Sequence, residues 1–366
     1  MHVMALVTDG FGGFGGIARY NQDFLTALSA SSAVEGVSVL PRRTPGRVAA
    51  LPEKIAQTLP ISSRTRYAME ALRRTAVMPR DTVVFCGHIL MAPLAMAVAF
   101  TRGFPVWLQT HGLDAWEMPS SHVRSSAERA TLVTTVSRFT RRRMVATWWR
   151  RDPNIIRVLP NTVSETFTPG PPPSHLVERW GLQGKKVLLS ISRMGIADRY
   201  KGQDRIIAAL PAIRVRHPDG VFLIGGDGED VLRLKRLAIE AGVGEHVRFL
   251  GHVPSADLVD YYRCADVFVM PSTKEGFGIV FLEAAACGVH VVGGRLDGSW
   301  DALREGIIGD GVDPTSQDEI IETVCQALSA KERQDPTLVS VFSREQFTEH
   351  VSRMAELAVE GRAWGA

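Results

Sequence analysis

Two glutamates, Glu275 and Glu283, have seven residues between them and enclose a glycine-bounded turn. The apolar run 267–271 before the turn predicts a buried strand, and residues 278–287 predict a short helix that ends at Gly288. At such a junction, free backbone N–H groups and the positive end of the helix dipole can bind phosphate, while carboxylates can bind sugar hydroxyls. The motif therefore predicts a site for an anionic, hydroxyl-rich ligand.

An ordinary helix with acidic residues in its first turn is the simpler explanation for either glutamate alone. Glu283, however, falls in the otherwise apolar segment 281–287, where a carboxylate is unusual. The N–H groups that would bind phosphate belong to five consecutive residues: Gly276, Phe277, Gly278, Ile279 and Val280.

Two cations, Arg193 and Lys201, follow a second predicted strand at 186–192, and Gly202 comes directly after the lysine. A guanidinium and an ammonium would neutralise a diphosphate. They would stabilise it most while a bond to the diphosphate breaks and negative charge develops on it. Arg199, between them, is either a third cation or a surface residue.

A glycine-rich loop from Gly10 to Gly16 follows the predicted strand 2–8 and leads into a helix-like segment. Such a loop is compatible with phosphate, but the same spacing occurs in dinucleotide-binding enzymes and in plain tight turns. Against the dinucleotide interpretation, no second strand ending in an acidic residue is evident after the loop, and Glu35 is a poor candidate for binding a ribose.

Short apolar runs alternate with helix-length amphipathic segments, which is typical of parallel sheets covered by helices. Four prolines within 168–174 favour a stiff connector between two sheets. We therefore expect an α/β protein with Rossmann-like domains at 1–167 and 168–345 and a C-terminal helix within 346–366. The expected strands are 2–8, 83–86, 105–110, 131–136 and 156–159, then 186–192, 220–225, 247–250, 267–270 and 289–293.

Ligands of open parallel sheets bind at the carboxyl ends of the strands, so two such domains are expected to share a cleft. His111 ends the strand 105–110 beside Gly112 and would face that cleft, with Asp114 as a weaker neighbour. The loop 293–301 either closes the site or is an ordinary loop.

The 366 residues, of which 45% are hydrophobic, suffice for two cores. We see no signal peptide, and no apolar run reaches the roughly 18 to 20 residues that span a bilayer, so a cytoplasmic protein is expected. The four cysteines lack metal-site spacing and are expected to be buried thiols: Cys86, Cys264, Cys287 and Cys325. No Asp-x-Asp pair lies in an exposed turn, so we expect neither a metal nor another cofactor.

Charge is distributed unevenly along the chain. Residues 1–163 contain 20 Lys and Arg against 10 Asp and Glu (+10), whereas residues 164–366 contain 22 against 29 (−7). Basic clusters at 64–66, 73–74 and 138–143, together with the run Trp148-Trp149-Arg150-Arg151, suit peripheral contact with an anionic membrane or, more simply, a solvated helix face. No nucleic-acid motif accompanies these charges, so no nucleic-acid partner is expected.

The Glu275–Glu283 motif resembles the signature of family-four retaining glycosyltransferases (glycosyl transferases group 1), which have the GT-B fold. Further landmarks of that family are matched by His111-Gly112, Arg193, Lys201-Gly202, the turn 225–228 and the segment 251–254, so the resemblance covers nearly the whole chain.

The resemblance implies a role for each matched residue. Four residues would be catalytic. His111 would lie beside the transferred sugar, and Arg193 and Lys201 would bind the diphosphate. Glu275, with the adjoining amides, would bind sugar and phosphate. Glu283 would bind the ribose of the donor. Gly15 and Gly16 would approach the diphosphate, Gly226 would let a helix pack near the nucleotide, and the backbone around Val253 would contact the base. The last helix would cross back to the first domain.

The resemblance also implies the reaction: transfer of a hexose, with retention, from a nucleoside-diphosphate sugar such as GDP-mannose or a UDP-sugar. The expected acceptor is a saccharide linked to lipid diphosphate, in bacterial surface polysaccharide or lipopolysaccharide synthesis at the inner face of the membrane. No side chain stands out as a nucleophile, which fits a front-face mechanism. A nucleotide-sugar epimerase or phosphorylase on the same fold and a non-catalytic nucleotide-sugar-binding module are the alternatives.

Overall fold

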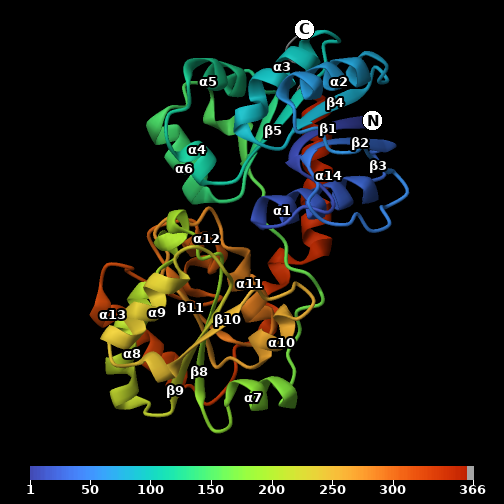
Figure 1. Cartoon of the computed structure of the whole chain (residues 1–366). Helices are drawn as coiled ribbons and strands as arrows, with labels where there is room; N and C mark the ends of the chain where they lie inside the picture. The colour runs from blue at the N-terminus through green and yellow to red at the C-terminus, as the bar shows by residue number, and fades with distance from the viewer. Residues whose placement is uncertain (361–366) are drawn as a thin grey trace. The chain divides into compact units, whose positions relative to one another are not determined.

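The computed structural model describes residues 1–360 and divides the chain into two compact units (Figure 1). The first unit contains residues 1–162 and the segment that begins at 344, and the second contains residues 163–343. The sequence placed these divisions at 168 and 346. Residues 361–366, the end of the predicted C-terminal segment, lie outside the described residues.

The first unit contains a parallel sheet of seven strands in the order β3-β2-β1-β4-β5-β6-β7. Its strands are β1 (His2–Asp9), β2 (Gly36–Arg43), β3 (Ile55–Gln57), β4 (Thr82–Cys86), β5 (Val106–Thr110), β6 (Leu132–Thr135) and β7 (Ile156–Val158). Its helices are α1 (Gly16–Ala30), α2 (Arg64–Ala76), α3 (Ala92–Phe100), α4 (Leu113–Trp116), α5 (Ser121–Glu128), α6 (Arg138–Thr147) and α14 (Arg344–Glu360), with short 3₁₀ turns η1 (Ile89–Met91) and η2 (Pro153–Ile155).

The second unit contains a parallel sheet of six strands in the order β10-β9-β8-β11-β12-β13. Its strands are β8 (Lys186–Ile191), β9 (Gly220–Gly225), β10 (Val247–Gly251), β11 (Val267–Met270), β12 (His290–Gly294) and β13 (Asp310–Val312). Its helices are α7 (Ser174–Trp180), α8 (Gln203–Arg216), α9 (Val231–Glu240), α10 (Leu258–Arg263), α11 (Ile279–Ala286), α12 (Ser299–Ala302) and α13 (Gln317–Ser329), with 3₁₀ helices η3 (Ile196–Lys201), η4 (Gly244–His246), η5 (Arg304–Gly306) and η6 (Pro336–Phe342).

All ten predicted strands are present, with ends that differ by at most one residue, but three further strands were missed: β2, β3 and β13. β3 and β13 are three-residue edge strands, and β2 contains Pro41 and ends in Arg42 and Arg43. A second strand that the sequence had not predicted therefore follows the glycine-rich loop. Arginines end it, in agreement with the prediction that no strand ending in an acidic residue follows the loop.

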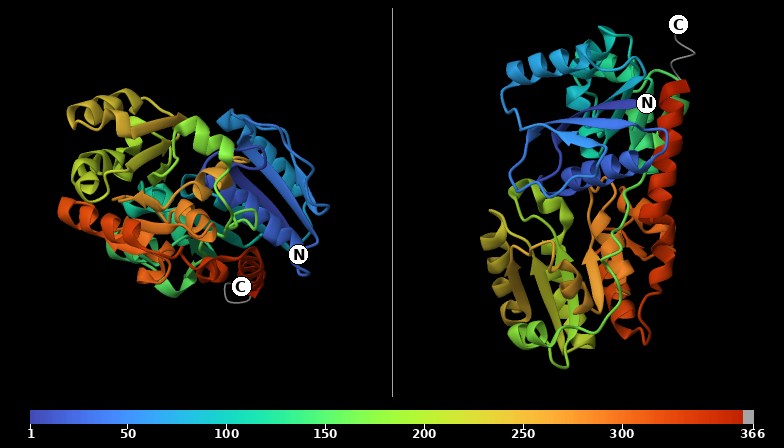
Figure 2. Two further views of the ribbon diagram at one scale, coloured as in Figure 1. Left: turned by 90° about the horizontal axis from the view of Figure 1, so that it is seen from below. Right: turned by 90° about the vertical axis from the view of Figure 1, so that its right-hand side faces the viewer.

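The C-terminal helix α14 belongs to the first unit, as the crossing-back expectation implied. It packs along α1, where Phe347 meets the ring of Tyr20 at 6.1 Å and Arg344 lies 3.4 Å from the Asp23 carboxylate. Figure 2 shows it as the long red helix beside the blue elements of that unit. The helix α14 thus completes the core formed by the first residues of the chain.

Trp148 and Trp149 are not interfacial aromatics, which corrects the expectation drawn from the run 148–151. Both are buried, and their indole N–H groups donate to the carbonyls of Ala115 at 2.7 Å and Asp152 at 3.3 Å. Both side chains pack in the core of the first sheet, because their large rings bury much apolar area while their N–H groups donate to carbonyls.

All four cysteines are buried free thiols, as predicted. Burial raises the pKa of Cys86 to about 12, so that thiol is unreactive at neutral pH. Within residues 1–360, no helix is both long and apolar enough to cross a bilayer.

Candidate functional site

The strand order of the second sheet reverses direction between β8 and β11, which are hydrogen-bonded neighbours. Such a reversal opens a crevice at the carboxyl ends of the two strands, because the following helices go to opposite faces of the sheet. Arg193 follows β8 and Glu275 follows β11. The topology therefore brings together the two motifs that the sequence singled out separately.

The two segments that leave these strands are joined along their length. The N–H of Thr273 donates to the carbonyl of Tyr200 at 3.0 Å, and the ammonium of Lys201 forms an ion pair with the Glu275 carboxylate. Gly202 adopts φ 81°, and a Cβ there would lie 2.6 Å from the carbonyl oxygen of Pro271. The glycine after the lysine is thus required by close packing, and that packing sets the lysine beside the glutamate.

Lys201 is a largely buried cation, with 12% of its side chain exposed, and its neighbours maintain its charge. Burial alone would lower the pKa of Lys201, but the Glu275 carboxylate, with Tyr200 and Asp198 further off, outweighs burial and raises that pKa above its usual value. Lys201 is therefore an ammonium at neutral pH, the form that can stabilise a developing phosphate charge.

The long spacing between Arg193 and Lys201 is accommodated by the 3₁₀ helix η3. Within it the buried Asp198 accepts a hydrogen bond from the Arg193 guanidinium at 2.9 Å, while 76% of the Arg193 side chain remains exposed. Arg199 points elsewhere and pairs with Asp230 at 2.7 Å. Arg193 is thus the more exposed cation of this loop, although each of the two arginines is paired with a buried aspartate.

The helix α11 begins at Ile279, immediately after Gly278, which has φ 86°. In residues 1–360, the N–H groups from Gly276 to Val280 donate to no other group of the chain. The side chain of Phe277 is buried against Phe342, with ring centroids 5.5 Å apart, so this residue can offer a ligand only its backbone. A row of amides at a helix N-terminus is a phosphate-binding arrangement.

Glu283 is buried in α11, with 8% of its surface exposed, and it accepts a hydrogen bond from the hydroxyl of Tyr262 at 2.8 Å. Tyr262 lies on α10, and burial, together with the adjoining Glu283 charge, raises its pKa well above the usual value. The tyrosine therefore remains a hydrogen-bond donor that orients this carboxylate. Sequence reasoning missed Tyr262, because nothing in the local pattern links it to a glutamate on another helix.

Gly226 and Val253 lie beyond the ends of β9, which neighbours β8, and of β10, which lies on the other side of β9. A Cβ on Gly226 would lie 1.8 Å from the carbonyl oxygen of Ser192, so only glycine permits the turn to approach the loop that leads to Arg193. Val253 is half-buried beside Gly225. Both residues thus border the same end of the sheet.

Asp297, which the sequence left in a loop of undecided role, contacts the Glu275 turn directly. Its carboxylate accepts the N–H of Glu275 at 2.6 Å, and it is 1% exposed. The available signal was its place after the carboxyl end of the predicted strand 289–293.

In the first unit, Gly15 and Gly16 begin α1 and are exposed, and a Cβ on either would meet no atom within 4 Å. The rest of the loop is fixed to the unit: the side-chain amide of Gln57 bonds both the N–H and the carbonyl of Phe11 at 2.9 Å. The open glycines are therefore free to approach a ligand, whereas the base of the loop is held in place.

His111 follows β5 and is held by its neighbours in the first unit. Its ring Nε2 lies 3.0 Å from the carbonyl of Gly87, and its backbone N–H donates to the Asp114 carboxylate at 2.9 Å. Its ring packs edge-on against that of Tyr20, with centroids 5.2 Å apart. Because a carbonyl only accepts, Nε2 carries the hydrogen and Nδ1 is left as an acceptor. Burial lowers the pKa of His111, so the neutral ring is favoured.

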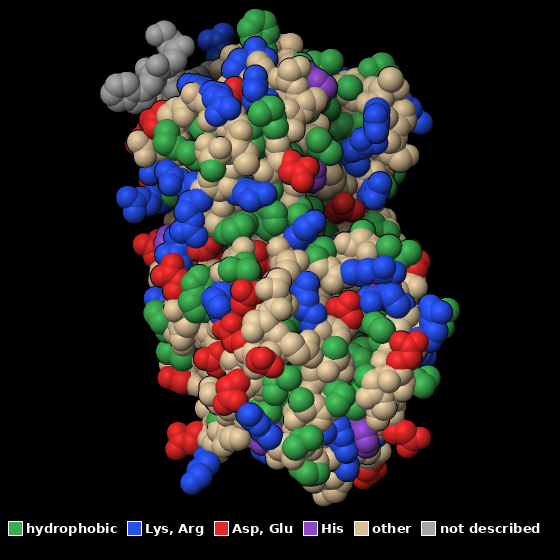
Figure 3. Space-filling model, turned by 90° about the vertical axis from the view of Figure 1, so that its left-hand side faces the viewer, with side chains coloured by type: hydrophobic (Ala, Val, Ile, Leu, Met, Phe, Trp, Pro, Cys, Tyr) green, Lys and Arg blue, Asp and Glu red, His purple; other side chains and the backbone are tan. Residues whose placement is uncertain are grey.

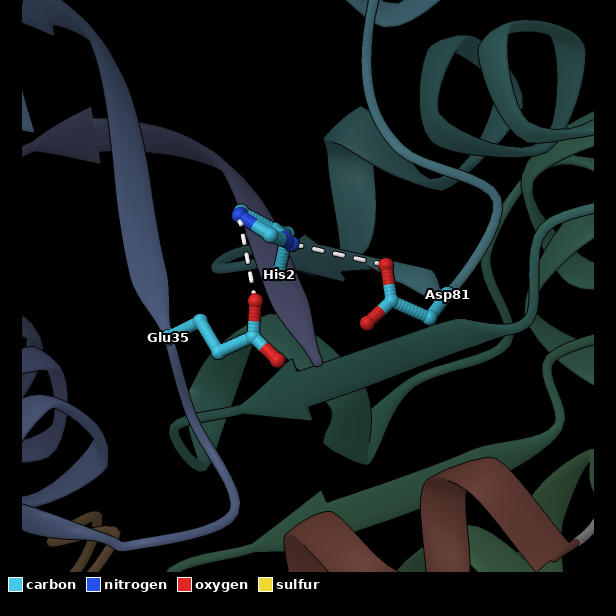
Figure 4. Close-up of side chains that lie close together, drawn as sticks. All are labelled: His2, Glu35 and Asp81. Carbon is cyan, nitrogen blue, oxygen red and sulfur yellow. Dashed lines mark hydrogen bonds and ion pairs between the residues drawn. The ribbon is translucent and has the colours of Figure 1, made fainter.

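His2, Glu35 and Asp81 form a group compact enough to suggest a metal site, the only such group within residues 1–360 (Figure 4). The two ring nitrogens face different carboxylates, Nδ1 to Asp81 at 3.4 Å and Nε2 to Glu35 at 3.9 Å. The Met1 ammonium also lies 3.5 Å from Asp81. The cluster fits an ion-pair network at the amino end of β1, the opposite end from the glycine-rich loop.

Comparison with known proteins agrees with the two-unit α/β fold described above. The chain resembles the solved structure of Anabaena HepE in complex with UDP and glucose, with a TM-score of 0.76 and 17% identity over 97% of this chain and 99% of that one. Two Rossmann-like units with this topology define a GT-B glycosyltransferase fold.

Sequence relatives identify the family. Residues 177–337 match the model of glycosyl transferases group 1. The chain is 36% identical over 287 residues, 75% of its length and 68% of the relative's, to the GDP-mannose-dependent alpha-(1-6)-phosphatidylinositol monomannoside mannosyltransferase of Mycolicibacterium smegmatis. It is 28% identical, over 84% of both chains, to a GDP-mannose-dependent monoacylated alpha-(1-6)-phosphatidylinositol monomannoside mannosyltransferase of Corynebacterium glutamicum. The chain belongs to the glycosyl transferases group 1 family and is a glycosyltransferase.

Proposed function

We propose that this glycosyltransferase moves a mannosyl residue from GDP-mannose to a lipid-linked saccharide, with retention of anomeric configuration and without a metal ion. The observation that carries the proposal is the convergence at β8 and β11: a buried ammonium, Lys201, touches the glutamate that precedes a row of free amides. The mannosyltransferase relatives support the choice of donor and of a glycolipid acceptor.

In the proposed reaction, the bond between the sugar C1 and the β-phosphate oxygen breaks while an acceptor oxygen bonds to C1 on the same face. The acceptor proton passes to a β-phosphate oxygen, and GDP leaves. Lys201, Arg193 and the amides of residues 276–280 stabilise the charge on the departing diphosphate, which takes the place of a metal ion. Glu275 binds sugar hydroxyls, and Glu283 binds those of the ribose. His111, Gly15 and Gly16 belong to the first unit, and the roles proposed for them, on the sugar and on the diphosphate, are those that the family resemblance implies.

The acceptor is proposed to be reached at the anionic inner face of the membrane. In the first unit, exposed arginines of α6 and the segment after it are accompanied by exposed apolar side chains, and Figure 3 shows blue and green side chains interspersed on the face of that unit seen there. The residues are Arg142, Arg143, Arg150, Arg151, Leu113, Met118 and Val145. Cations and apolar side chains together favour an anionic lipid surface. We infer a place in the assembly of a bacterial surface polysaccharide, lipopolysaccharide or glycolipid.

The test is transfer from a panel of donors to phosphatidylinositol monomannoside in the presence of EDTA. GDP-mannose, GDP-glucose, UDP-glucose and UDP-galactose are compared, the product mass is measured, and the anomeric configuration is read from NMR coupling constants. We expect a mannosylated product of retained configuration from GDP-mannose alone. Conversion of the donor without an acceptor would indicate an epimerase, and nucleotide binding without turnover on any acceptor would indicate a binding module. A requirement for added divalent metal would contradict the metal-independent mechanism.

A further inference from the structure

The backbone of Glu275 is held at both of its polar groups by two consecutive residues of the loop after β12. Its N–H donates to Oδ2 of Asp297 at 2.6 Å, and its carbonyl accepts from the N–H of Gly298 at 2.8 Å. Because both the N–H and the carbonyl of Glu275 are held, the backbone at this residue has little freedom to rotate. The direction of the Glu275 side chain is thus set from outside its own segment.

Asp297 also joins the two ends of the turn that contains Glu275. Its Oδ2 accepts from the hydroxyl of Ser272, two residues after the end of β11, at 2.9 Å. Its Oδ1 accepts from the N–H of Ser299 at 2.9 Å. Three donors therefore converge on one carboxylate, which accepts at both oxygens. An amide in its place would present its NH₂ group to at least one N–H or O–H donor.

Gly298 allows the loop to lie directly on the turn. A Cβ there would lie 2.1 Å from the carbonyl oxygen of Gly276 and 2.7 Å from that of Glu275. A Cβ on Gly294 would likewise lie 2.2 Å from the carbonyl oxygen of Ser272. The two segments are in contact along the whole turn, so a shift of one displaces the other.

A buried carboxylate is an expensive means of joining two loops, because burial disfavours its charge. Burial raises the pKa of Asp297 to about 6, with the Glu275 charge as a further contribution. The two carboxylates repel each other, and this favours the orientation in which Glu275 points to Lys201. A loop needed only for stability would be served by an uncharged hydrogen-bonding residue.

We propose that Asp297 is a positioning residue for the donor sugar: its carboxylate, with Gly298 behind it, holds Glu275 in the direction that the reacting sugar requires. This inference rests on the proposed function of the Glu275–Glu283 site. The residue acts through Glu275 and has no direct contact with the substrate. Misplacement of such a group by about 1 Å is enough to reduce turnover on the order of 100-fold.

The experiment compares the wild-type chain with Asp297→Asn and with Asp266→Asn as a matched control. Asp266 belongs to the same unit and accepts the N–H of Val187 at 2.8 Å, but it lies at the amino end of β11. For each protein, kcat and KM for GDP-mannose, the Kd for GDP by calorimetry and the thermal midpoint are measured. We expect Asp297→Asn to lower kcat roughly 10- to 100-fold while GDP affinity stays within about threefold, because Glu283 and the amides contact the nucleotide. Asp266→Asn should match the wild type in kcat.

The pH profile separates positioning from a general loss of structure. Wild-type kcat should fall as the pH drops through about 6, when Asp297 takes up a proton, and Asp297→Asn should lack that decline. Glu275 is the charged group that faces Asp297, since Ser272 and Ser299 are uncharged, Arg295 is paired with Glu319, and Asp301 on α12 has interactions of its own.

The possible outcomes distinguish a failure of the proposed function from a failure of the positioning role of Asp297. A wild-type chain that binds no GDP and transfers no sugar overturns the proposed function and this inference with it. An active wild type with an equally active Asp297→Asn overturns the positioning role alone, as does a variant in which kcat, GDP affinity and thermal midpoint fall together. Should Asp297→Asn fail to fold, Ser272→Ala, which removes one donor to the carboxylate, is expected to lower kcat severalfold with GDP affinity retained. An unchanged kcat in that variant would also overturn the inference.

Discussion

Lys201 and Glu275 form an ion pair in which the lysine is 12% and the glutamate 13% exposed, although 74 residues separate them along the chain. One follows β8 and the other follows β11, and these strands meet where the order of the sheet reverses. The pair places a cation for the leaving diphosphate next to a carboxylate for the sugar. Each group also offsets part of the cost of burying the other.

Replacement of Lys201 by methionine should lower kcat about 10²- to 10³-fold, the usual cost of removing one group that stabilises transition-state charge. It should also destabilise the fold by up to about 3 kcal/mol, because the Glu275 charge is left without a partner. Steady-state kinetics and thermal unfolding measure the two effects. Lys186→Met, which removes a half-exposed pair with Asp266, is the control and should change neither by much. A Lys201→Met enzyme with wild-type kcat would remove the lysine from the mechanism.

Replacement of Tyr262 by phenylalanine should weaken GDP binding about fivefold, corresponding to roughly 1 kcal/mol for one hydrogen bond. The reason is that Glu283 loses the hydroxyl that orients it, 2.8 Å away. Calorimetry should show no such loss with 2′,3′-dideoxy-GDP, because that ligand offers Glu283 no ribose hydroxyl. Tyr261→Phe is the neighbouring control. An equal loss with both nucleotides would mean that Glu283 does not bind the ribose.

Asp297 should make the wild type lose stability as the pH rises, relative to Asp297→Asn. Its pKa is raised from 3.8 to about 6 in the folded protein. The folded state therefore binds the proton more tightly than the unfolded state, and this stabilisation is complete below about pH 3.8 and lost as the pH passes 6. A rise in pKa of this size corresponds to a stabilisation on the order of 3 kcal/mol. Denaturant unfolding at pH 4 to 8 measures the difference between the two proteins, and a difference independent of pH would contradict it.

His111 should remain neutral to a lower pH than an ordinary histidine, since burial lowers its pKa. Nitrogen NMR of labelled protein, with His111→Asn to assign the signal, should show the Nε2–H tautomer and a midpoint below the usual 6.5. The unfolded state takes up this proton more readily than the folded state, so the histidine makes the fold less stable as the pH falls below 6.5. A midpoint above 6.5 would contradict the effect of burial, and an Nδ1–H tautomer would contradict the contact with Gly87.

Binding to anionic vesicles should depend on salt and on α6. Sedimentation with phosphatidylglycerol vesicles should retain the protein at low ionic strength and release most of it at about 0.5 M salt, where charges are screened within a few ångströms. Arg142→Glu with Arg143→Glu should reduce binding at low salt and leave GDP affinity unchanged. Binding that persists in high salt, or none in low salt, would refute the electrostatic membrane contact.

The sequence was informative where chemistry is local. Glycines and charged residues at strand ends are recognisable because a strand, a turn and a helix start leave their marks within a few residues, as in the segment 267–288. Most of the ten strands found in advance are buried apolar runs. β3 and β13 have only three residues each at the sheet edges, and β2 has Pro41, Arg42 and Arg43 in its second half, so the pairing of these strands with a neighbour was not evident from the sequence. The aromatic pair Trp148 and Trp149 was misjudged because burial is a property of the packed unit.

By itself, then, the sequence determined the α/β class, the candidate donor residues and the family, because each depends on residue types at short spacing. Tertiary structure alone decided which of these residues meet. Lys201 pairs with Glu275, Tyr262 donates to Glu283, and Asp297 accepts from the N–H of Glu275. In each pair the two residues lie on separate segments, which only the order of the strands brings together. Contacts of this kind have no local signature, since a buried charge or hydroxyl is stable only once the rest of the fold has supplied its partner.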